Sequence, residues 1–475
     1  MAREEPLNMG NKLNFFRSFE KPCFCTLYVR ILILAALATL SGCSSFRPWV
    51  NVAQKTEVQQ EDDYRTGPVL VAVTLSGGGA RAAAFGLGVL KELKRTEFTL
   101  DGRPTTLLDE VALVSGVSGG SILAAHYAAF GDQTLERFEP EFLLKPFEST
   151  LLKQVFYPNH LFDLTSPWFG RTHILAQRLD ELYEGMTFGD VRKNSKAPSL
   201  MITATDLTTG APFDFTPEQF ALICSDLNSV PLSFAVASSS AVPIILSPMT
   251  LHNFSDRCGK ALFPPDRSAS GSPDFRIQML QQSSEGYLDA NARPYIHLVD
   301  GGVSDNLGIR LMIDRLMANG SVYNSFPGVL RHSIRRIVLV AVNSARDLAT
   351  RVDLSDEVPS TGEVLETLLY GAGARETQMT LALLENDIKR MAAELDEARS
   401  REDSPFSADV EIHLINVSLR DLEEPDIRTS LLRVPTAFTI EAFDVRALQD
   451  AGSAALRSSN AFQRLKQSLD HLDKH

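Results

Sequence analysis

The sequence has little of what nucleic-acid binding or metal binding requires. Its 46 Lys and Arg residues are outnumbered by 59 Asp and Glu residues, which gives a formal net charge of −13 at pH 7. Lys and Arg neutralise phosphates when a protein binds nucleic acid, so this charge argues against a nucleic-acid partner and against purely electrostatic docking on anionic lipid. The 5 cysteines and 9 histidines form no cluster with zinc-ligand spacing, and no segment resembles a dedicated calcium loop. We therefore expect no metal and no cofactor.

The N-terminal apolar run is too short to cross a bilayer as a mature helix. Residues 31–40 are mostly apolar over about ten positions and follow basic residues that include Arg17, Lys21 and Arg30, a pattern typical of a signal peptide. The tetrapeptide Leu-Ser-Gly-Cys at residues 40–43 resembles the bacterial lipobox, in which the cysteine is acylated and becomes the mature N-terminus. This resemblance predicts a lipid anchor on Cys43, and Ser44 resembles the signal for outer-membrane sorting. An ordinary secretory signal with a chance cysteine is the alternative.

The apolar pattern predicts an α/β protein. Segments rich in β-branched and apolar residues are expected to be strands at residues 69–75, 111–114, 199–205, 296–299, 337–343 and 410–417. Helical segments lie between most of them. Such alternation predicts three layers, α/β/α, with a mostly parallel central sheet covered on both faces. In sheets of this kind the active site lies at the carboxyl ends of the strands. A last helix is expected from near Glu441 toward Leu472, and residues 266–293, rich in Ser, Gly and Gln, are expected to be a mobile loop.

The pentapeptide Gly-Val-Ser-Gly-Gly at residues 116–120 has the Gly-x-Ser-x-Gly pattern of a nucleophile elbow. The pattern occurs often by chance, so it indicates a nucleophile only where it lies between a strand and a helix. It follows a predicted strand and precedes a helix of small residues, where Gly116 and Gly120 tolerate a sharp turn and close backbone packing. Because such a turn projects the hydroxyl clear of the backbone, Ser118 is predicted to be a nucleophile.

Three consecutive glycines, Gly77, Gly78 and Gly79, lie between a predicted strand and a predicted helix and have three interpretations. In the first, their N–H groups and the helix N-terminus stabilise the oxyanion that forms when Ser118 attacks an ester carbonyl. In the second, residues 77–82 are a dinucleotide fingerprint of the G-x-G-x-x-A type. That fingerprint needs an acidic residue at the end of the next strand, where this sequence has serine and glycine, so the oxyanion loop is favoured. A plain tight turn is the third.

The tripeptide Asp-Gly-Gly at residues 300–302 would on its own suggest a hairpin turn. Here it ends the predicted strand at residues 296–299, so Asp300 is expected at the same edge of the sheet as Ser118. A carboxylate at that edge can accept the serine proton directly, provided that partial burial raises its basicity. Asp300 is therefore predicted to be the general base. His126 and His297 are poorly placed to replace it, so a histidine-dependent triad is the less favoured mechanism.

Together these three segments resemble the patatin-like phospholipase family. Its pattern is a glycine-rich oxyanion loop followed by a basic residue, a Gly-x-Ser-x-Gly elbow, and an Asp-Gly-Gly motif that completes a Ser/Asp dyad. The resemblance covers residues 68–307, and residues 237–243 also resemble a family segment. It implies that Arg81, the basic residue of the loop, orients the loop or meets an anionic head group. Ala82 is a departure, because the family commonly has glycine there.

The resemblance implies a phospholipase or lipid esterase that acts on membrane lipid. A catalytically silent envelope lipoprotein that binds lipid or protein is the alternative. The predicted divisions are a lipoprotein signal peptide (residues 1–42), a polar tether (43–67), a patatin-like catalytic core (68–345) and a C-terminal helical region with one added strand (346–475). A lipid anchor would place the protein in the bacterial cell envelope, with the outer membrane favoured. Whether Cys224 and Cys258 pair is left open by spacing alone.

The segment at residues 143–169 contains more aromatic residues than a plain connection needs. It could cap or border a lipid-binding cleft, or it could form a satellite core of its own. The sequence does not choose between these two interpretations.

Overall fold

The computed structural model describes residues 44–55, 66–258, 275–318, 321–326, 328–345, 353, 355–360, 364, 367 and 372–472. The predicted signal peptide and the predicted lipidation site, Cys43, lie outside the described residues.

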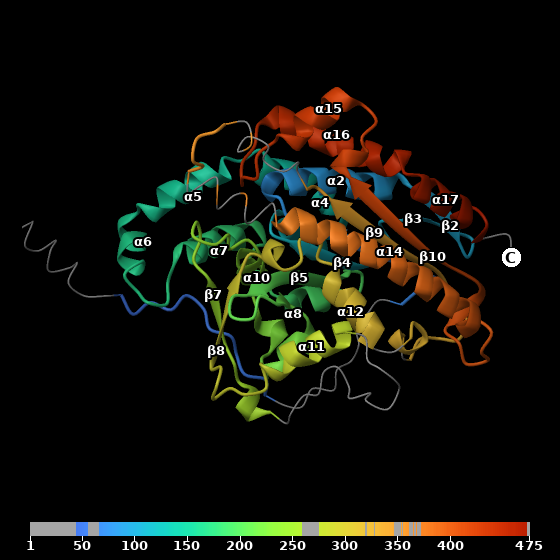
Figure 1. The fold of residues 1–475 in the computed structure, drawn as a ribbon, viewed down its shortest axis with the longest axis horizontal. Coiled ribbons are helices and arrows are strands. Elements are labelled where there is room, and N and C mark those ends of the chain that lie inside the picture. The colour runs from blue at the N-terminus through green and yellow to red at the C-terminus, as the bar shows by residue number, and fades with distance from the viewer. Residues whose placement is uncertain are drawn as a thin grey trace, which may run out of the picture.

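An eight-stranded, mostly parallel sheet forms the centre of the described part of the chain (Figure 1). Its order is β10-β9-β1-β4-β5-β8-β7, with β6 paired to β5. The strands from β10 to β5 run parallel, whereas β6, β7 and β8 are antiparallel to their neighbours. Their bounds are β1 (Val69–Leu75), β4 (Val111–Val117), β5 (Ser199–Asp206), β6 (Pro212–Asp214), β7 (Met249–His252), β8 (Tyr295–Val299), β9 (Ile334–Asn343) and β10 (Phe406–Ser418). A separate hairpin consists of β2 (Glu97–Leu100) and β3 (Arg103–Thr106).

Helices cover both faces of the sheet. The longer ones are α2 (Gly79–Arg95), α3 (Gly119–Phe130), α7 (Arg171–Leu182), α11 (Phe275–Glu285), α14 (Ala372–Ala398), α16 (Ala442–Ser458) and α17 (Asn460–Leu469). The shorter ones are α4 (Thr134–Phe138), α5 (Phe147–Val155), α6 (Pro158–Asp163), α8 (Phe188–Arg192), α9 (Pro217–Leu222), α10 (Leu232–Ser239), α12 (Arg310–Ala318) and α15 (Pro425–Leu432). Within the described residues, no helix combines the length and apolar character that a membrane span needs.

Side chains of the central strands alternate between two apolar cores. Along β1, Val71 and Val73 lie in the core that includes α2, α3 and α16, whereas Leu70 and Ala72 pack against the core that includes α12 and α14. A strand that is apolar at every position is expected when both faces of a sheet are covered. The structure therefore confirms the predicted three-layer α/β/α fold with a mostly parallel sheet.

All of the predicted strands are present, and most extend beyond their predicted ends. Two other predictions were wrong. The apolar spacing predicts one last helix from Glu441 toward Leu472, but the chain turns extended at Ser459, whose hydroxyl then caps α17 by accepting from the Phe462 amide. The Ser-, Gly- and Gln-rich residues 266–293 predict a loop, yet α11 forms within them.

The C-terminal region completes the same sheet. β10 pairs in parallel with β9, and α16 packs along α2. Gly88 and Gly452 stand where these two helices meet, because a Cβ on either glycine would overlap a backbone carbonyl of the other helix. The glycine loop at the start of α2 is therefore supported from the C-terminal side of the chain.

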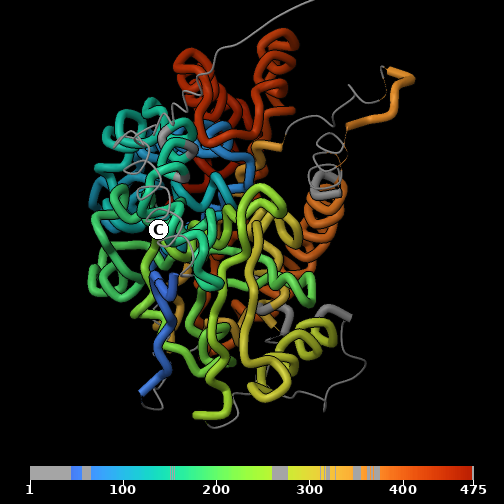
Figure 2. Tube along the Cα trace, turned by 90° about the vertical axis from the view of Figure 1, so that its left-hand side faces the viewer, coloured from blue at the N-terminus to red at the C-terminus, as the bar shows by residue number. Residues whose placement is uncertain are grey.

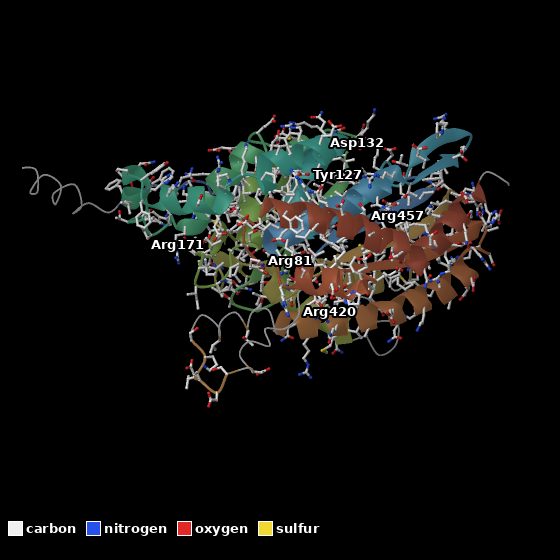
Figure 3. The ribbon with its side chains drawn as sticks, turned by 90° about the horizontal axis from the view of Figure 1, so that it is seen from above. Arg81, Tyr127, Asp132, Arg171, Arg420 and Arg457 are labelled. Atoms are coloured by element: carbon white, nitrogen blue, oxygen red, sulfur yellow. A yellow bond between two sulfur atoms is a disulfide. The ribbon has the colours of Figure 1, made fainter. Side chains whose placement is uncertain are left out.

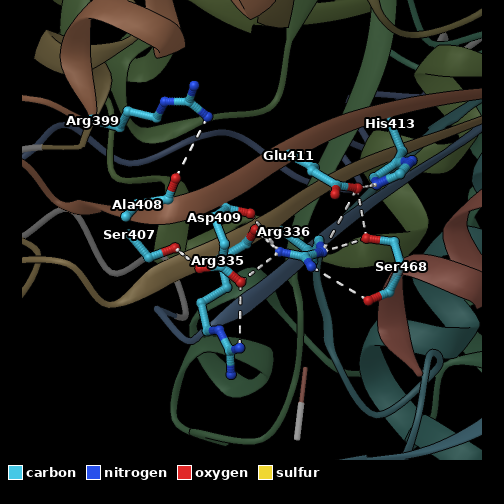
Figure 4. A network of polar contacts seen from close by, with 9 residues as sticks. All are labelled: Arg335, Arg336, Arg399, Ser407, Ala408, Asp409, Glu411, His413 and Ser468. Atoms are coloured by element: carbon cyan, nitrogen blue, oxygen red, sulfur yellow. Dashed lines mark hydrogen bonds and ion pairs between the residues drawn. The ribbon is translucent and has the colours of Figure 1, made fainter. Parts of the chain in front are cut away.

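Arg336 of β9 joins β10 and α17 through a network of polar contacts (Figure 4). The residue is buried, and its Nε donates to the Ser468 hydroxyl at 2.6 Å. Its Nη1 donates to the Asp409 carbonyl at 2.8 Å, and its Nη2 to the Ser468 carbonyl at 3.3 Å. The Ser468 hydroxyl in turn donates to Glu411 at 2.6 Å. One buried guanidinium therefore fixes the last helix to the outer strands.

Residues 44–55, the first part of the segment predicted as a tether, lie against the domain; they are the dark blue segment of Figure 2. The Asn51 side chain is buried and donates to the Ser225 hydroxyl and to the His252 carbonyl, both at 2.9 Å. Trp49 packs on Phe234 with ring centroids 4.3 Å apart. These contacts hold the start of the described chain to the surface of the domain.

Cys224 and Cys258, whose pairing the sequence left open, form a disulfide with their Cα atoms 5.8 Å apart. It connects the residues after α9 to the short turn after β7. The Gln54 amide donates to the Cys224 carbonyl at 2.9 Å, so the N-terminal segment passes directly over this link.

Candidate active site

Ser118 lies at the sharp turn between β4 and α3. Its backbone has φ 48° and ψ −122°, a conformation that residues other than glycine rarely adopt. Gly116 and Gly120 let this turn pack closely. A Cβ on Gly116 would lie 2.6 Å from the Ser121 Cα, and one on Gly120 would overlap the Leu75 carbonyl. The turn thus has the strand-to-helix geometry of a nucleophile elbow.

The Ser118 hydroxyl donates a hydrogen bond of 2.9 Å to Oδ2 of Asp300. The other carboxylate oxygen, Oδ1, accepts from the Gly302 amide at 2.8 Å. The backbone of Asp300 is fixed as well, because its amide donates to the Ala241 carbonyl at 3.0 Å and its carbonyl accepts from the Thr205 hydroxyl at 2.8 Å. The structure therefore brings the two predicted residues together and directs one carboxylate oxygen at the serine.

Burial changes the acidity of Asp300, which is 8% exposed. Loss of hydration raises the pKa of its carboxyl from the ordinary 3.8 to about 6, although the hydrogen bonds from Gly302 and Ser118 act in the opposite direction. A carboxylate with this pKa is a stronger base than an exposed aspartate and is still ionised at neutral pH.

The glycine loop ends β1 and begins α2. Gly78 has φ 142° and Gly79 has φ 62°, a region of backbone conformation that favours glycine. A Cβ on Gly119 would overlap the Gly79 carbonyl, so the loop packs against the residue that follows Ser118. In the described part of the chain the amides of Gly78 and Gly79 have no hydrogen-bond acceptor. Two backbone donors at a helix N-terminus therefore lie next to the elbow.

Gly77 differs from the prediction that it would donate to an oxyanion. Its amide donates to the Asn306 carbonyl at 3.0 Å, so this N–H is already occupied. A Cβ on Gly77 would lie 2.5 Å from Oδ1 of Asn306 and 3.5 Å from the Ser118 Cβ. Because Gly77 has no side chain, Asn306 and Ser118 can both lie close to its backbone. Of the three amides predicted to bind the oxyanion, those of Gly78 and Gly79 remain as candidates.

Arg81, labelled near the middle of the view in Figure 3, is only 2% exposed. Its Nη1 donates to the Val434 carbonyl at 2.8 Å. One residue earlier, the Ala80 amide donates to the Ala437 carbonyl at 2.7 Å. The first turn of α2 is thus held by the segment between α15 and α16. This burial favours a role in orienting the loop over contact with a lipid head group.

The family model for patatin-like phospholipase matches residues 73–313, just over half of the chain. The chain belongs to the patatin-like phospholipase family. The matched residues include the glycine loop, the elbow and the Asp300 turn. No curated protein matches the chain.

Solved structures that the chain resembles include human GIVD cytosolic phospholipase A2, VipD from Legionella pneumophila and the ExoU-SpcU complex of Pseudomonas aeruginosa. The human enzyme is 15% identical with a TM-score of 0.44, and the match covers 88% of this chain and 64% of that one. For VipD the identity is 13%, the TM-score 0.27, and the coverage 91% and 72%. For ExoU the identity is 14%, the TM-score 0.26, and the coverage 96% and 62%. The chain thus spans less than two thirds of the length of the human enzyme.

Polar residues that the sequence analysis did not assign hold this patatin-like site in place. The Ser239 hydroxyl accepts from the Ser118 amide at 2.8 Å. The Ser344 hydroxyl donates to the Gly77 carbonyl at 3.0 Å, opposite the Asn306 contact. Ser239 belongs to the serine-rich segment that resembles the family, which was an available signal. Ser344 and Asn306 carry no local signal, because their role arises only when distant segments meet.

The histidines weighed as alternatives lie away from the dyad. His297 hydrogen-bonds to Thr250, and His126 is buried with its ring against Thr134. In the part of the chain that the structure describes, no group of three or more His, Cys, Asp or Glu side chains could hold a metal ion.

A cavity of about 750 Å³ lies at the amino ends of the strands, the end of the sheet away from Ser118 and Asp300. Asp109 and Pro198, which precede β4 and β5, are among its lining residues, so it opens at the amino ends of these strands. Ser118 and Asp300 do not line it, and active sites of such sheets lie at the carboxyl ends. We do not assign the substrate to this cavity.

Proposed function

We propose that this chain is a membrane-anchored serine hydrolase that cleaves acyl esters of phospholipids by a phospholipase A type reaction. The observation that carries the proposal is the 2.9 Å hydrogen bond from the Ser118 hydroxyl to Asp300, a buried carboxylate whose pKa is raised to about 6. Membership of the patatin-like phospholipase family supports lipid acyl hydrolysis. An enzyme anchored to a bilayer meets its lipid substrate at high effective concentration.

In the first half of the reaction, Ser118 attacks the carbonyl carbon of the ester while Asp300 takes the hydroxyl proton. The carbonyl electrons move to the oxygen, where the amides of Gly78 and Gly79 and the N-terminus of α2 stabilise the negative charge. When the carbon–oxygen bond to the leaving group breaks, Asp300 returns the proton to the departing alcohol. The acyl group is then an ester of Ser118.

In the second half, Asp300 takes a proton from water, and the hydroxide formed attacks the acyl carbon. The same loop amides stabilise the second oxyanion. Its collapse releases the fatty acid, and Ser118 recovers its proton from Asp300. Both halves need one base and one set of donors, so no histidine is required.

We infer that Cys43 carries the anchor and that the protein lies in the bacterial cell envelope, at the outer membrane. The signal-type apolar run and the lipobox support this location. The Cys224–Cys258 disulfide supports it independently, because disulfides persist in oxidising compartments. Cells grown with a radioactive fatty acid should label the wild-type chain and not Cys43→Ala. A wild-type chain without label would rule out the anchor.

The catalytic proposal is tested with Ser118→Ala and Asp300→Asn. Each should abolish release of fatty acid from phospholipid vesicles while leaving the circular dichroism spectrum unchanged. Matched controls are Ser333→Ala and Asp396→Asn, because Ser333 is half-buried, Asp396 is exposed, and both lie outside the site. Full activity in Ser118→Ala or Asp300→Asn would overturn the mechanism.

A catalytically silent lipoprotein that binds lipid or protein is the second candidate. The intact Ser118–Asp300 hydrogen bond counts against it. A fluorophosphonate probe separates the two, since only an activated serine reacts in the folded state. Labelling of the wild type but not of Ser118→Ala supports the hydrolase, and absence of labelling supports the binding protein.

A further inference from the structure

Six large apolar side chains lie exposed together at one end of the molecule: Phe46, Phe156, Tyr157, Leu161, Phe162 and Trp168. We call this surface the α5–α6 face; Figures 1 and 2 show the helices at that end. Phe156 is 72% exposed and Trp168 is 45% exposed. Single exposed apolar residues are ordinary, but a group of this size marks an interaction surface.

The segment also has an inner side that fixes it to the domain. Phe147, Leu151 and Phe169 are buried, and the Phe147 ring packs against Phe142 with centroids 5.2 Å apart. The interpretation of residues 143–169 as a satellite core therefore holds for these buried side chains, and a cleft bordered by the segment stays a prediction. The outer side chains remain exposed, although the Arg47 guanidinium lies 3.9 Å from the centroid of the Trp168 ring.

The start of the described chain lies on this same face. The Ser44 amide donates to the Thr165 hydroxyl at 2.8 Å, and the Ser166 hydroxyl donates to the Phe46 carbonyl at 2.8 Å. The Phe46 ring packs on Phe169 with centroids 5.5 Å apart. Because consecutive Cα atoms are about 3.8 Å apart, acyl chains on Cys43 would begin within one residue of the α5–α6 face.

Contacts also connect this end of the molecule, through the Ile244–Ile245 loop, to Asp300. Arg171, which Figure 3 shows toward the same end, donates to the Ile244 carbonyl at 2.7 Å. Ile244 and Ile245 are both exposed. They follow Ala241, whose carbonyl accepts from the Asp300 amide at 3.0 Å. A path of a few residues therefore leads from the exposed apolar surface to the general base.

We propose that the α5–α6 face and the Ile244–Ile245 loop dock on the surface of the phospholipid bilayer that holds the anchor. The proposal rests on the proposed function for the anchor on Cys43. Trp and Tyr favour the boundary between head groups and acyl chains, and Phe and Leu insert below it. The net charge of −13 leaves apolar insertion, rather than attraction to anionic lipid, as the source of binding. In this arrangement the domain itself lies on the bilayer, with the Ile244–Ile245 loop in contact with lipid.

The two tryptophans of the chain provide a direct test. The acylated Ser118→Ala protein, which cannot consume the bilayer, is reconstituted into phosphatidylcholine vesicles with brominated acyl chains. With Trp49→Phe added, the remaining Trp168 should lose at least about half of its fluorescence to bromine, since it lies at the interface. With Trp168→Phe added instead, the remaining Trp49, packed on Phe234, should be quenched far less. If bromine quenched the fluorescence of Trp168 as weakly as that of Trp49, the proposal would be overturned.

A second experiment uses the active enzyme and a matched pair of variants. Phe156→Ser with Phe162→Ser should lower hydrolysis of vesicles by about tenfold and leave hydrolysis of a soluble short-chain ester unchanged, because only vesicles need docking. The control is Phe443→Ser, because Phe443 is an exposed phenylalanine on α16, outside the α5–α6 face. Quenching of Trp168 in a protein that hydrolyses nothing would leave docking standing and remove the proposed function. Normal vesicle hydrolysis by the double variant would remove docking and leave the function.

Discussion

The Ser239 hydroxyl accepts a hydrogen bond of 2.8 Å from the Ser118 amide and donates one of 2.6 Å to the Thr203 carbonyl. Ser118 is thereby held to α10, a helix 121 residues away in the sequence, and to β5. The backbone of Ser118 needs such support, because a strained conformation costs about 1–3 kcal/mol and persists only where surrounding contacts impose it. The angle at which the nucleophile meets Asp300 therefore depends on Ser239.

Replacing Ser239 should lower turnover without removing the dyad. Ser239→Ala leaves the Ser118 amide and the Thr203 carbonyl short of a buried partner, which costs about 1–3 kcal/mol. We expect kcat to fall by about 10- to 100-fold, KM to change little, and the fluorophosphonate reaction to slow in parallel. The matched control is Ser238→Ala, whose buried hydroxyl donates within its own helix to the Phe234 carbonyl at 2.8 Å. Equal kcat values for the two variants would contradict the role given to Ser239.

The dependence of activity on pH should report the acidity of Asp300. The base must be ionised to take the serine proton, and burial raises its pKa to about 6. The value of kcat/KM on a soluble ester should therefore be constant above pH 7 and fall about tenfold for each pH unit below 6. A profile that stays flat down to pH 4.5 would show that a group with a lower pKa acts as the base.

The same burial should make Asp300 a source of instability at neutral pH. In the native state the pKa of this carboxyl is about 6, whereas its ordinary value is 3.8, so the folded protein holds the proton to a higher pH. The ionised carboxylate then disfavours the fold above pH 6 by about 3 kcal/mol, and this penalty vanishes below pH 3.8. Asp300→Asn should raise the melting temperature relative to wild type at pH 8 and lose that advantage near pH 4. Calorimetry at both pH values would show it, and an advantage of the same size at both would argue against this origin.

The parts of the site that the sequence predicts are those that short segments specify. A β-branched strand, a glycine-flanked serine and a small-residue helix follow one another within residues 111–130, so local preferences and tertiary structure agree there. Contacts between segments that are far apart in the chain leave no recognisable pattern in the sequence. The hydrogen bond from Arg81 to the Val434 carbonyl joins residues 353 positions apart, and nothing around Val434 indicates it. The occupied Gly77 amide was missed for the same reason, since its acceptor is a backbone carbonyl that any residue could supply.

Substitution in the glycine loop should separate backbone strain from loss of the oxyanion donors. Gly79→Ala places a Cβ at φ 62° and against Ala437, which displaces the amide next to the elbow. We expect kcat to fall by about 100- to 1000-fold, as for the loss of an oxyanion donor. Gly210→Ala is the matched control, because its φ is 69° and nothing lies within 4 Å of the added Cβ. Gly210→Ala should lose about 1 kcal/mol of stability, Gly79→Ala should lose more because its Cβ also meets the Ala437 backbone, and only Gly79→Ala should lose activity. Normal turnover by Gly79→Ala would remove this amide from the mechanism.

Arg336 should contribute far more to stability than its neighbour Arg335. Arg336→Ala deprives the Ser468 hydroxyl and the Asp409 carbonyl of a buried charged donor, which should lower the free energy of unfolding by about 3–5 kcal/mol. Arg335 makes a single, more exposed ion pair with Asp409 at 3.3 Å, so Arg335→Ala should cost less than about 1 kcal/mol. Urea denaturation measures both values. Because Arg336 fixes α17 to β10 rather than the site itself, the esterase activity of folded Arg336→Ala should remain close to that of the wild type. A loss of stability as small as that of Arg335→Ala would mean that α17 is held by its apolar contacts alone.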